Sequence, residues 1–179
     1  MGTGADRAGS GGRARRLPEA PGRGERVVSV SDRLAELGLA LPPVVTPVAA
    51  YVPAVTSGNL VFTAGQLPMV GGVLPAVGKV GAEVNAEEAK QFARICALNA
   101  LAAAESVIGS LDRVTRVVKV VGFVASAPDF TGQPGVVNGA SELLGEVFGD
   151  IGAHARSAVG VAVLPLDAPV EVELILEFA

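Results

Sequence analysis

Two apolar runs of strand length lie near the end of the chain, on either side of a short polar connection. They cover residues 155–163 and 170–178, and the connection over residues 165–169 holds two prolines and an aspartate, which favour turns. The pattern predicts two strands joined as a hairpin. Because side chains alternate between the two faces of a strand, each run has one face rich in valine or leucine, which we expect in the core.

Arg156 interrupts the apolar pattern of the first of these strands. It shares a face with Ala158, Gly160 and Ala162, whose small side chains leave room beside the guanidinium. Such a guanidinium is suited to binding a carboxylate, because its planar fork donates two parallel hydrogen bonds. The alternative is a salt bridge with Glu177, which would lie across the hairpin. The pattern alone does not decide between these two interpretations.

The apolar pattern of the rest of the chain predicts an α+β domain. Strands are expected over residues 49–56, 60–64, 71–75 and 113–126, the third as a short strand or a turn. Helices are expected over residues 31–38, 85–108 and 136–148. Asn85 and Glu88 resemble a capping box at the start of the long helix. The strand over 113–126 has valine on both sides, so we expect it to be central and covered on both faces.

Composition limits the chemistry that the chain can perform. Half of the 179 residues are hydrophobic, which is enough for a domain with a proper core. Cys96 and His154 are the only residues of their kinds, so an internal disulfide is excluded and metal binding is not expected. We expect Cys96 to be buried and His154 to be a loop residue beside a strand, although any Ser–His or Cys–His scheme would need His154. Since no apolar run reaches the length of a membrane helix, we expect a cytoplasmic protein.

Residues 1–26 differ from the rest of the sequence. They hold six arginines, three acidic residues and many glycines, without apolar periodicity. Such a segment buries too little surface to offset its ordering entropy, so we expect a disordered tail followed by a single domain over residues 27–179. An arm for RNA or an anionic surface, and a start codon placed too far upstream, are alternative interpretations. The domain carries eight basic and fifteen acidic side chains, which argues against a nucleic-acid partner.

Motifs over about residues 48–179 resemble those of the RidA/YjgF family. The C-terminal signature is Ala155-Arg-Ser-Ala-Val-Gly-Val161, followed by Leu164-Pro165 and Val170-Glu-Val-Glu173. Further matches are Tyr51, the hairpin motif Gly58-Asn-Leu-Val-Phe-Thr-Ala-Gly-Gln-Leu-Pro68 and Val137-Asn138. The resemblance implies a chorismate-mutase-like fold with a mixed six-stranded sheet, two helices packed on one face and a homotrimeric assembly.

The resemblance also implies a site at a cleft between neighbouring subunits. Arg156 would hold the substrate carboxylate, Glu171 and an ordered water would assist proton transfer, and Asn138 would hold neighbouring strands or loops. The residues implied for substrate binding are Arg156, Tyr51, Asn138 and the backbone of Ala64 and Gly65. Packing at a pocket rim and a solvated strand face are the simpler interpretations of Tyr51 and Glu171. The resemblance implies no cofactor and no metal.

The reaction implied is the hydrolysis of a 2-imino acid, or its enamine tautomer, to a 2-keto acid and ammonia. Holding the substrate by its carboxylate and presenting a polarised water supplies proximity and general acid–base help. Three departures favour an alternative, a member that binds a small carboxylated metabolite with little turnover. Ala64 stands where the family commonly has serine, Ala158 where many members have cysteine, and the loop over 129–135 is longer than in well-known members. A ribonuclease, an activity for which some relatives are named, is a remote alternative because the domain is acidic.

Overall fold

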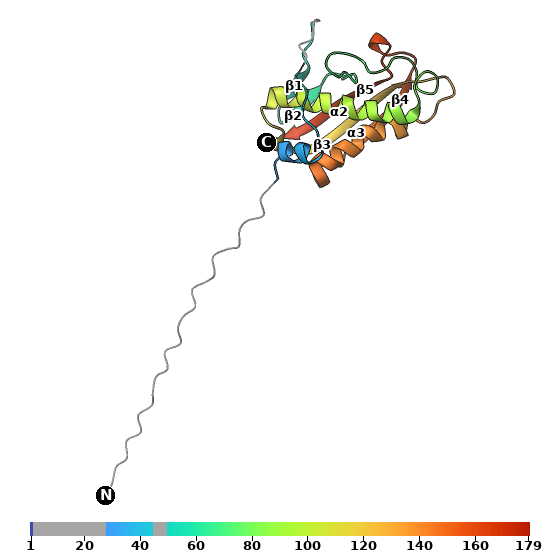
Figure 1. Ribbon diagram of the computed structural model, residues 1–179. Helices are drawn as coiled ribbons and strands as arrows, with labels where there is room; N and C mark the ends of the chain where they lie inside the picture. Colours follow the sequence, from blue (N-terminus) through green and yellow to red (C-terminus); the bar gives the residue numbers. More distant parts are fainter. Residues whose placement is uncertain (2–27, 45–49) are drawn as a thin grey trace.

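The computed structural model describes residues 1, 28–44 and 50–179 (Figure 1). The tail that the sequence predicts over residues 1–26 lies outside the described residues, apart from Met1. Ala49, at the predicted start of the first strand, lies outside them as well. The disorder of the tail and the division into tail and domain therefore stay predictions. The described residues form a layer of strands and a layer of helices.

Five strands form a single mixed sheet in the order β1-β2-β5-β3-β4. They are β1 (Ala54–Ser57), β2 (Leu60–Thr63), β3 (Val114–Ala125), β4 (Ala155–Val161) and β5 (Val170–Phe178). Neighbouring strands are antiparallel except β3 and β4, which are parallel. The described residues thus hold five strands and not the six that the sequence predicts. Residues 71–75 do not form a strand, because Gly71 and Gly72 make a turn closed by an isolated bridge between Val70 and Val73.

The predicted hairpin between the last two strands is wrong. β3 lies between β4 and β5 and pairs with both. With twelve residues it is the longest strand of the sheet, so it offers a partner along each edge, and the shorter β4 lies at the rim of the sheet. The predicted alternative, a salt bridge between Arg156 and Glu177, is excluded within the chain for the same reason. Glu177 lies on β5 beside β2 and accepts a hydrogen bond from Asn59 at 2.9 Å.

Two long helices, α2 (Ala86–Ile108) and α3 (Gln133–Phe148), cover one face of the sheet (Figure 1). The short helix α1 (Val30–Glu36) packs against α3. The predicted capping box of α2 is confirmed, because Asn85 Oδ1 accepts the backbone N–H of Glu88 at 2.9 Å. Helix α3 begins before the predicted residue 136, because Pro134 fits the first turn of a helix, where its missing N–H is not needed.

The apolar core lies between the sheet and the helices. The residues of β5 that face the helices and are buried are Val170, Val172, Leu174 and Leu176. This alternation confirms the prediction for β5. The prediction for β4 is wrong, because Val159 points away from the helices and is 44% exposed. β3 is central as predicted, but Phe123 on its second face is only half-buried. One face of the sheet therefore stays partly open in the single chain.

Candidate functional site

Arg156 lies on β4 and points toward α3. Its partner in the parallel pairing of β3 and β4 is Val120, whose buried side chain faces the helices, and residues paired in this way share a face of the sheet. Arg156 Nη1 donates to Asn138 Oδ1 at 2.8 Å and to Ser141 Oγ at 3.1 Å. Asn138 and Ser141 are three residues apart on α3 and so lie on the same side of that helix. The structure thus brings together Arg156 and Asn138, both of which the sequence predicts for the site.

The guanidinium of Arg156 has only uncharged partners among the described residues. None of the three salt bridges in that part of the chain includes it, and its acceptors are an amide and a hydroxyl. Nη1 uses its two hydrogens on these acceptors, whereas Nε and Nη2 donate to no described residue. A half-buried cation with such donors left over is suited to a carboxylate, which accepts two parallel hydrogen bonds.

The space beside Arg156 is narrower than the sequence predicts. Ala158 and Gly160 share its face of β4, but a Cβ on Gly160 would lie 2.8 Å from Gln133 Nε2. The side chain of Gln133 therefore fills the room that the glycine leaves, and it donates to Ser126 Oγ at 3.2 Å. The small residues of β4 thus allow the start of α3 to approach the strand closely.

Two residues without a predicted role in binding extend the group around Arg156. Ser141 Oγ lies 2.9 Å from His154 Nε2, and His154 Nδ1 lies 2.6 Å from the carbonyl oxygen of Gly152. His154 directly precedes β4, as the sequence predicts, but it is connected to Arg156 through Ser141. The sequence signal for Ser141 is its spacing of three from Asn138 within a predicted helix. No sequence pattern indicates the pair of Ser141 and His154.

Glu171 lies on the opposite face of the sheet from Arg156. It is paired with Phe123 of β3 and alternates with the buried Val170. A Cβ at Gly65 would overlap the Glu171 carboxylate, so only glycine allows this close approach. Partial burial raises the pKa of the Glu171 carboxyl, and the neighbouring Glu173 carboxylate raises it further. A carboxyl with a raised pKa is suited to general acid–base chemistry.

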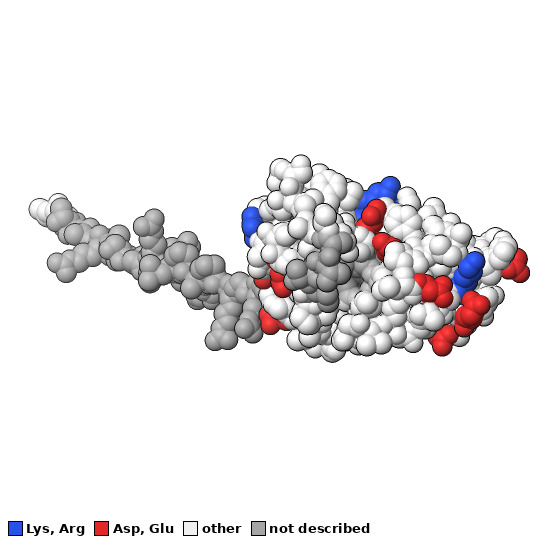
Figure 2. All heavy atoms as spheres, turned by 90° about the horizontal axis from the view of Figure 1, so that it is seen from above, with Lys and Arg blue, Asp and Glu red and all other residues white. Residues whose placement is uncertain are grey.

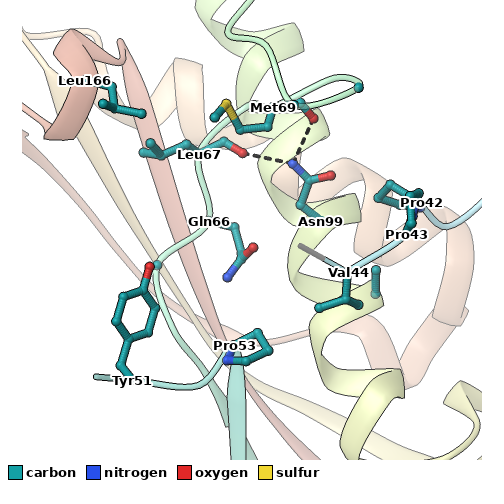
Figure 3. A pocket seen from close by; sticks show the side chains of 14 residues that line it. Pro42, Pro43, Val44, Tyr51, Pro53, Gln66, Leu67, Met69, Asn99 and Leu166 are labelled. Atoms are coloured by element: carbon teal, nitrogen blue, oxygen red, sulfur yellow. Dashed lines mark hydrogen bonds between the residues drawn. The ribbon is translucent and has the colours of Figure 1, made fainter. Parts of the chain in front are cut away.

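A cavity of about 690 Å³ adjoins Gly65 (Figure 3). Most of its wall is apolar and includes Pro42, Pro53, Leu67, Met69 and Leu166. Asn99 of α2 holds the loop that forms one side, because its Nδ2 donates to two backbone carbonyl oxygens of that loop at 2.9 and 3.1 Å. Tyr51 contributes to the lining and is 59% exposed. The structure thus places Tyr51 and Gly65 at the same cavity.

The backbone N–H groups of Ala64 and Gly65, both predicted to bind substrate, differ in whether they are free to donate to a ligand. The N–H of Ala64 is donated to Pro53 O at 2.8 Å, and Ala64 O accepts from Gln66 Nε2 at 3.2 Å. The N–H of Gly65 donates to no described residue. Of the two, only Gly65 offers a backbone donor to a ligand.

The predicted site residues therefore form two groups in the single chain. Arg156 and Asn138 lie between β4 and α3, on the helix-covered face. Glu171 lies with Gly65 on the other face, and Tyr51 shares a cavity with Gly65. The sheet separates the two groups, so one chain alone does not bring Arg156 and Glu171 to one substrate.

Other chemistries find little support in the described part of the chain. It contains no group of three His, Cys, Asp or Glu side chains that could hold a metal ion. Cys96 is buried as predicted, and burial, with a smaller effect of the Glu171 charge, raises the pKa of its thiol well above the usual range, which disfavours a thiolate nucleophile. None of the helices among the described residues is long and apolar enough to cross a membrane. On the face seen in Figure 2, Lys and Arg side chains lie apart from one another among acidic ones.

Comparison with known proteins identifies the family to which this chain belongs. Residues 31–178 match the profile of a family described as "YjgF/chorismate_mutase-like, putative endoribonuclease". The chain belongs to the YjgF/chorismate-mutase-like family. Protein TCP17 of Trypanosoma cruzi is 46% identical to this family member over 149 residues, which are 83% of this chain and 93% of that protein. The resemblance to RidA/YjgF proteins inferred from the motifs is thereby confirmed.

Solved structures resemble this YjgF-family chain as well. Protein Atu1372 of Agrobacterium tumefaciens is 45% identical with a TM-score of 0.79, and the match covers 84% of this chain and 94% of that one. A protein of Shewanella oneidensis MR-1 described as a putative endoribonuclease is 31% identical with a TM-score of 0.81, covering 84% and 99% of the two chains. Escherichia coli TdcF with bound serine is 25% identical with a TM-score of 0.57, covering 78% and 94%.

Proposed function

We propose that this protein hydrolyses small 2-imino acids, or their enamine tautomers, to 2-keto acids and ammonia. The observation that carries the proposal is the half-buried guanidinium of Arg156, which has two uncharged acceptors and unused donors among the described residues. A 2-imino acid presents the carboxylate that such a group binds, directly beside the carbon that reacts. The serine bound to E. coli TdcF has an α-carboxylate of the same kind.

A homotrimer is part of the proposal, because the two groups of residues lie on opposite faces of one sheet. Assembly around a threefold axis covers the open face of each sheet with a neighbouring copy. Apolar side chains on that face, Val159 and Phe123 among them, then leave contact with water, which favours the assembly. In this arrangement Glu171 of one copy approaches Arg156 of the next, and the cleft between them binds one substrate.

The chain's own residues divide the chemistry between them. Arg156 holds the carboxylate through Nε and Nη2, and a water attacks the carbon of the protonated imine while one of its protons passes to Glu171. The product of this step carries a hydroxyl and an amine on the same carbon. Glu171 returns the proton to nitrogen, the C–N bond breaks, and the hydroxyl becomes the keto group as its proton passes through Glu171 to the departing ammonia. The protonated imine and one water thus give one 2-keto acid and one ammonium ion.

The environment of Glu171 suits this exchange of protons. Burial, with the neighbouring Glu173 carboxylate, raises the pKa of the Glu171 carboxyl above that of an ordinary glutamate, which makes its carboxylate a better proton acceptor. Gly65 lies beside this carboxylate, and its N–H, which donates to no described residue, supplies a neutral donor for the water or the developing hydroxyl. Tyr51, at the rim of the adjoining cavity, lines the pocket for the rest of the substrate.

Ala64 is a specific reason for a second candidate function, the binding of a small carboxylated metabolite with little turnover. Its position lacks the hydroxyl that serine would place beside Gly65, and its own N–H is occupied by Pro53 O. Carboxylate binding by Arg156 is unaffected by this loss, whereas the positioning of water depends on fewer donors. Cleavage of RNA, suggested by the family description, fits the acidic domain poorly.

One experiment separates these candidates. The full chain is added to freshly generated 2-iminopropanoate, and ammonia release is compared with the uncatalysed rate and with the rate of a serine variant, Ala64→Ser. Accelerated release by the natural chain supports the deaminase. Binding of 2-oxobutanoate without acceleration, with activity gained by Ala64→Ser, supports the binding protein. If 2-oxobutanoate neither binds nor competes and an RNA oligomer is cleaved, the proposed function is wrong.

A further inference from the structure

His154 and Ser141 form a chain of hydrogen bonds that ends at Arg156. His154 Nδ1 lies 2.6 Å from the carbonyl oxygen of Gly152, and because a carbonyl oxygen only accepts, Nδ1 carries a hydrogen. In the neutral imidazole Nε2 then has a lone pair. Ser141 Oγ, 2.9 Å away, donates its hydrogen to that lone pair. The backbone at Gly152 thereby selects the tautomer of His154.

This tautomer also fixes the direction of the bond between Ser141 and Arg156. With its hydrogen committed to His154, the Ser141 oxygen turns its lone pairs toward Arg156 Nη1, which donates to it at 3.1 Å. Without an acceptor at Nε2, the hydroxyl would rotate and bond a backbone carbonyl of the preceding helical turn, as serine does in helices. Asn138 Oδ1 would then be the main acceptor for Nη1, and the guanidinium would turn more easily.

We infer that His154 and Ser141 are positioning residues, which set the orientation in which Arg156 presents its Nε and Nη2 edge to a carboxylate. Both hydrogens of Nη1 are used on Asn138 and Ser141, so a bidentate contact has to come from that other edge. His154 achieves this without touching the substrate. The identity of the ligand rests on the proposed function, whereas the hydrogen-bond chain does not.

The first test follows the Arg156 guanidinium by ¹⁵N NMR in the ligand-free full chain. Its rotation should be slow in the natural protein and faster in both His154→Ala and Ser141→Ala. His154→Gln places an amide oxygen near the position of Nε2 and should restore slow rotation. Ser106→Ala is the matched control, because Ser106 also lies on a helix and its hydroxyl donates to Ala103 O at 2.7 Å. Equal rotation in all these proteins would overturn the inference.

The second test measures binding of 2-oxobutanoate by calorimetry. The bond between Ser141 and Arg156 exists without ligand, so its loss in Ser141→Ala or His154→Ala leaves binding to order the guanidinium, and each variant should bind about 3- to 10-fold more weakly. The double variant should bind no more weakly than Ser141→Ala, because the two residues act in series. Additive losses would contradict the inference. If the natural chain binds no 2-oxobutanoate while Arg156 rotation still depends on His154, the proposed function fails and the positioning role stands.

Discussion

Arg156 differs from Arg33 and Arg94 in the kind of group that holds its guanidinium. Arg33 and Arg94 pair with glutamates at 3.0 and 2.6 Å, and partly exposed pairs of this kind contribute little to stability. Arg156 is held by an amide and a hydroxyl, so its charge has no counter-ion among the described residues. A half-buried cation without a counter-ion gains more from an incoming anion than a paired one does. Changes at Arg156 should therefore affect ligand binding more than folding.

Arg156→Ala should weaken binding of 2-oxobutanoate by more than tenfold, because charge-assisted hydrogen bonds contribute about 1.5–3 kcal/mol each. Arg156→Lys should recover only part of the affinity, since an ammonium keeps the charge and loses the fork. Calorimetry measures both, with Arg94→Ala as a control that removes a guanidinium between α2 and α3 away from the site. A loss of the folded state in both Arg156 variants, with unchanged affinity in the folded remainder, would make Arg156 a structural residue.

Glu171 and Glu83 should give the stability of the protein opposite dependences on pH. The pKa of Glu171 is raised above the ordinary 4.5, mainly by burial. Its contribution to stability is therefore complete below pH 4.5 and is lost as the pH rises through the pKa of the folded state. Glu171→Gln should thus gain stability relative to the natural chain between pH 4 and pH 7.5, as measured by urea unfolding.

The pKa of Glu83 is lowered, first by the hydrogen bond from the Lys79 N–H at 2.9 Å and then by its own N–H. Its contribution is present above the ordinary pKa and is lost as the pH falls through the pKa of the folded state. Glu83→Gln should therefore lose stability relative to the natural chain as the pH rises to 5 from about 3, the range around and below the ordinary pKa in which this contribution develops. The same slope for both variants would contradict the assigned causes.

At the scale of elements, the sequence predicts what depends on neighbouring residues and misses what depends on distant ones. The capping box at Asn85 and the alternation of β5 are local patterns, and both are confirmed. The choice of β3 as the partner of β4 depends on residues far apart in the sequence, so adjacent apolar runs wrongly indicate a hairpin. The prediction that the valine face of β4 lies in the core is wrong as well, since Val159 is 44% exposed. Within the site, Arg156 and Asn138 follow from family motifs, whereas the bond of Ser141 to His154 is a tertiary contact with no motif.

The packing of α2 on α3 depends on one glycine of α3. A Cβ on Gly139 would overlap the backbone carbonyl of Lys90, whereas a Cβ on Gly145 of the same helix would have no atom within 4 Å. Gly139→Ala should therefore destabilise the protein by about 1–3 kcal/mol, because two helix backbones have to move apart. Gly145→Ala should stabilise it by about 0.5–1 kcal/mol through helix propensity. Urea unfolding of both variants checks this, and equal effects would show that the helices do not meet closely at Gly139.

At the scale of the whole molecule, the open face of the sheet is the surface that the proposed trimer needs. Val159 on that face and Val107 on α2 are matched in exposure, at 44% and 42%. Val159→Glu should dissociate the assembly, because a charge would be buried between copies, and Val107→Glu should leave it intact. Light scattering distinguishes a mass near 17.9 kDa from roughly three times that value. A natural chain that is a monomer, or an assembly that survives Val159→Glu, would contradict the proposed interface.

The proposed cleft allows a second test of the assembly, because it requires Arg156 and Glu171 to come from different copies of the chain. Arg156→Ala and Glu171→Gln chains should each be inactive alone. After unfolding and refolding together in equal amounts, a cleft works only when its Arg156 comes from a Glu171→Gln chain and its Glu171 from an Arg156→Ala chain. Random assembly around a threefold axis gives this pairing in about one quarter of the clefts, so about one quarter of the natural deaminase rate should return. Each variant refolded alone is the control. Mixed trimers, verified by mass, that remain inactive would show that the two residues do not act across one interface.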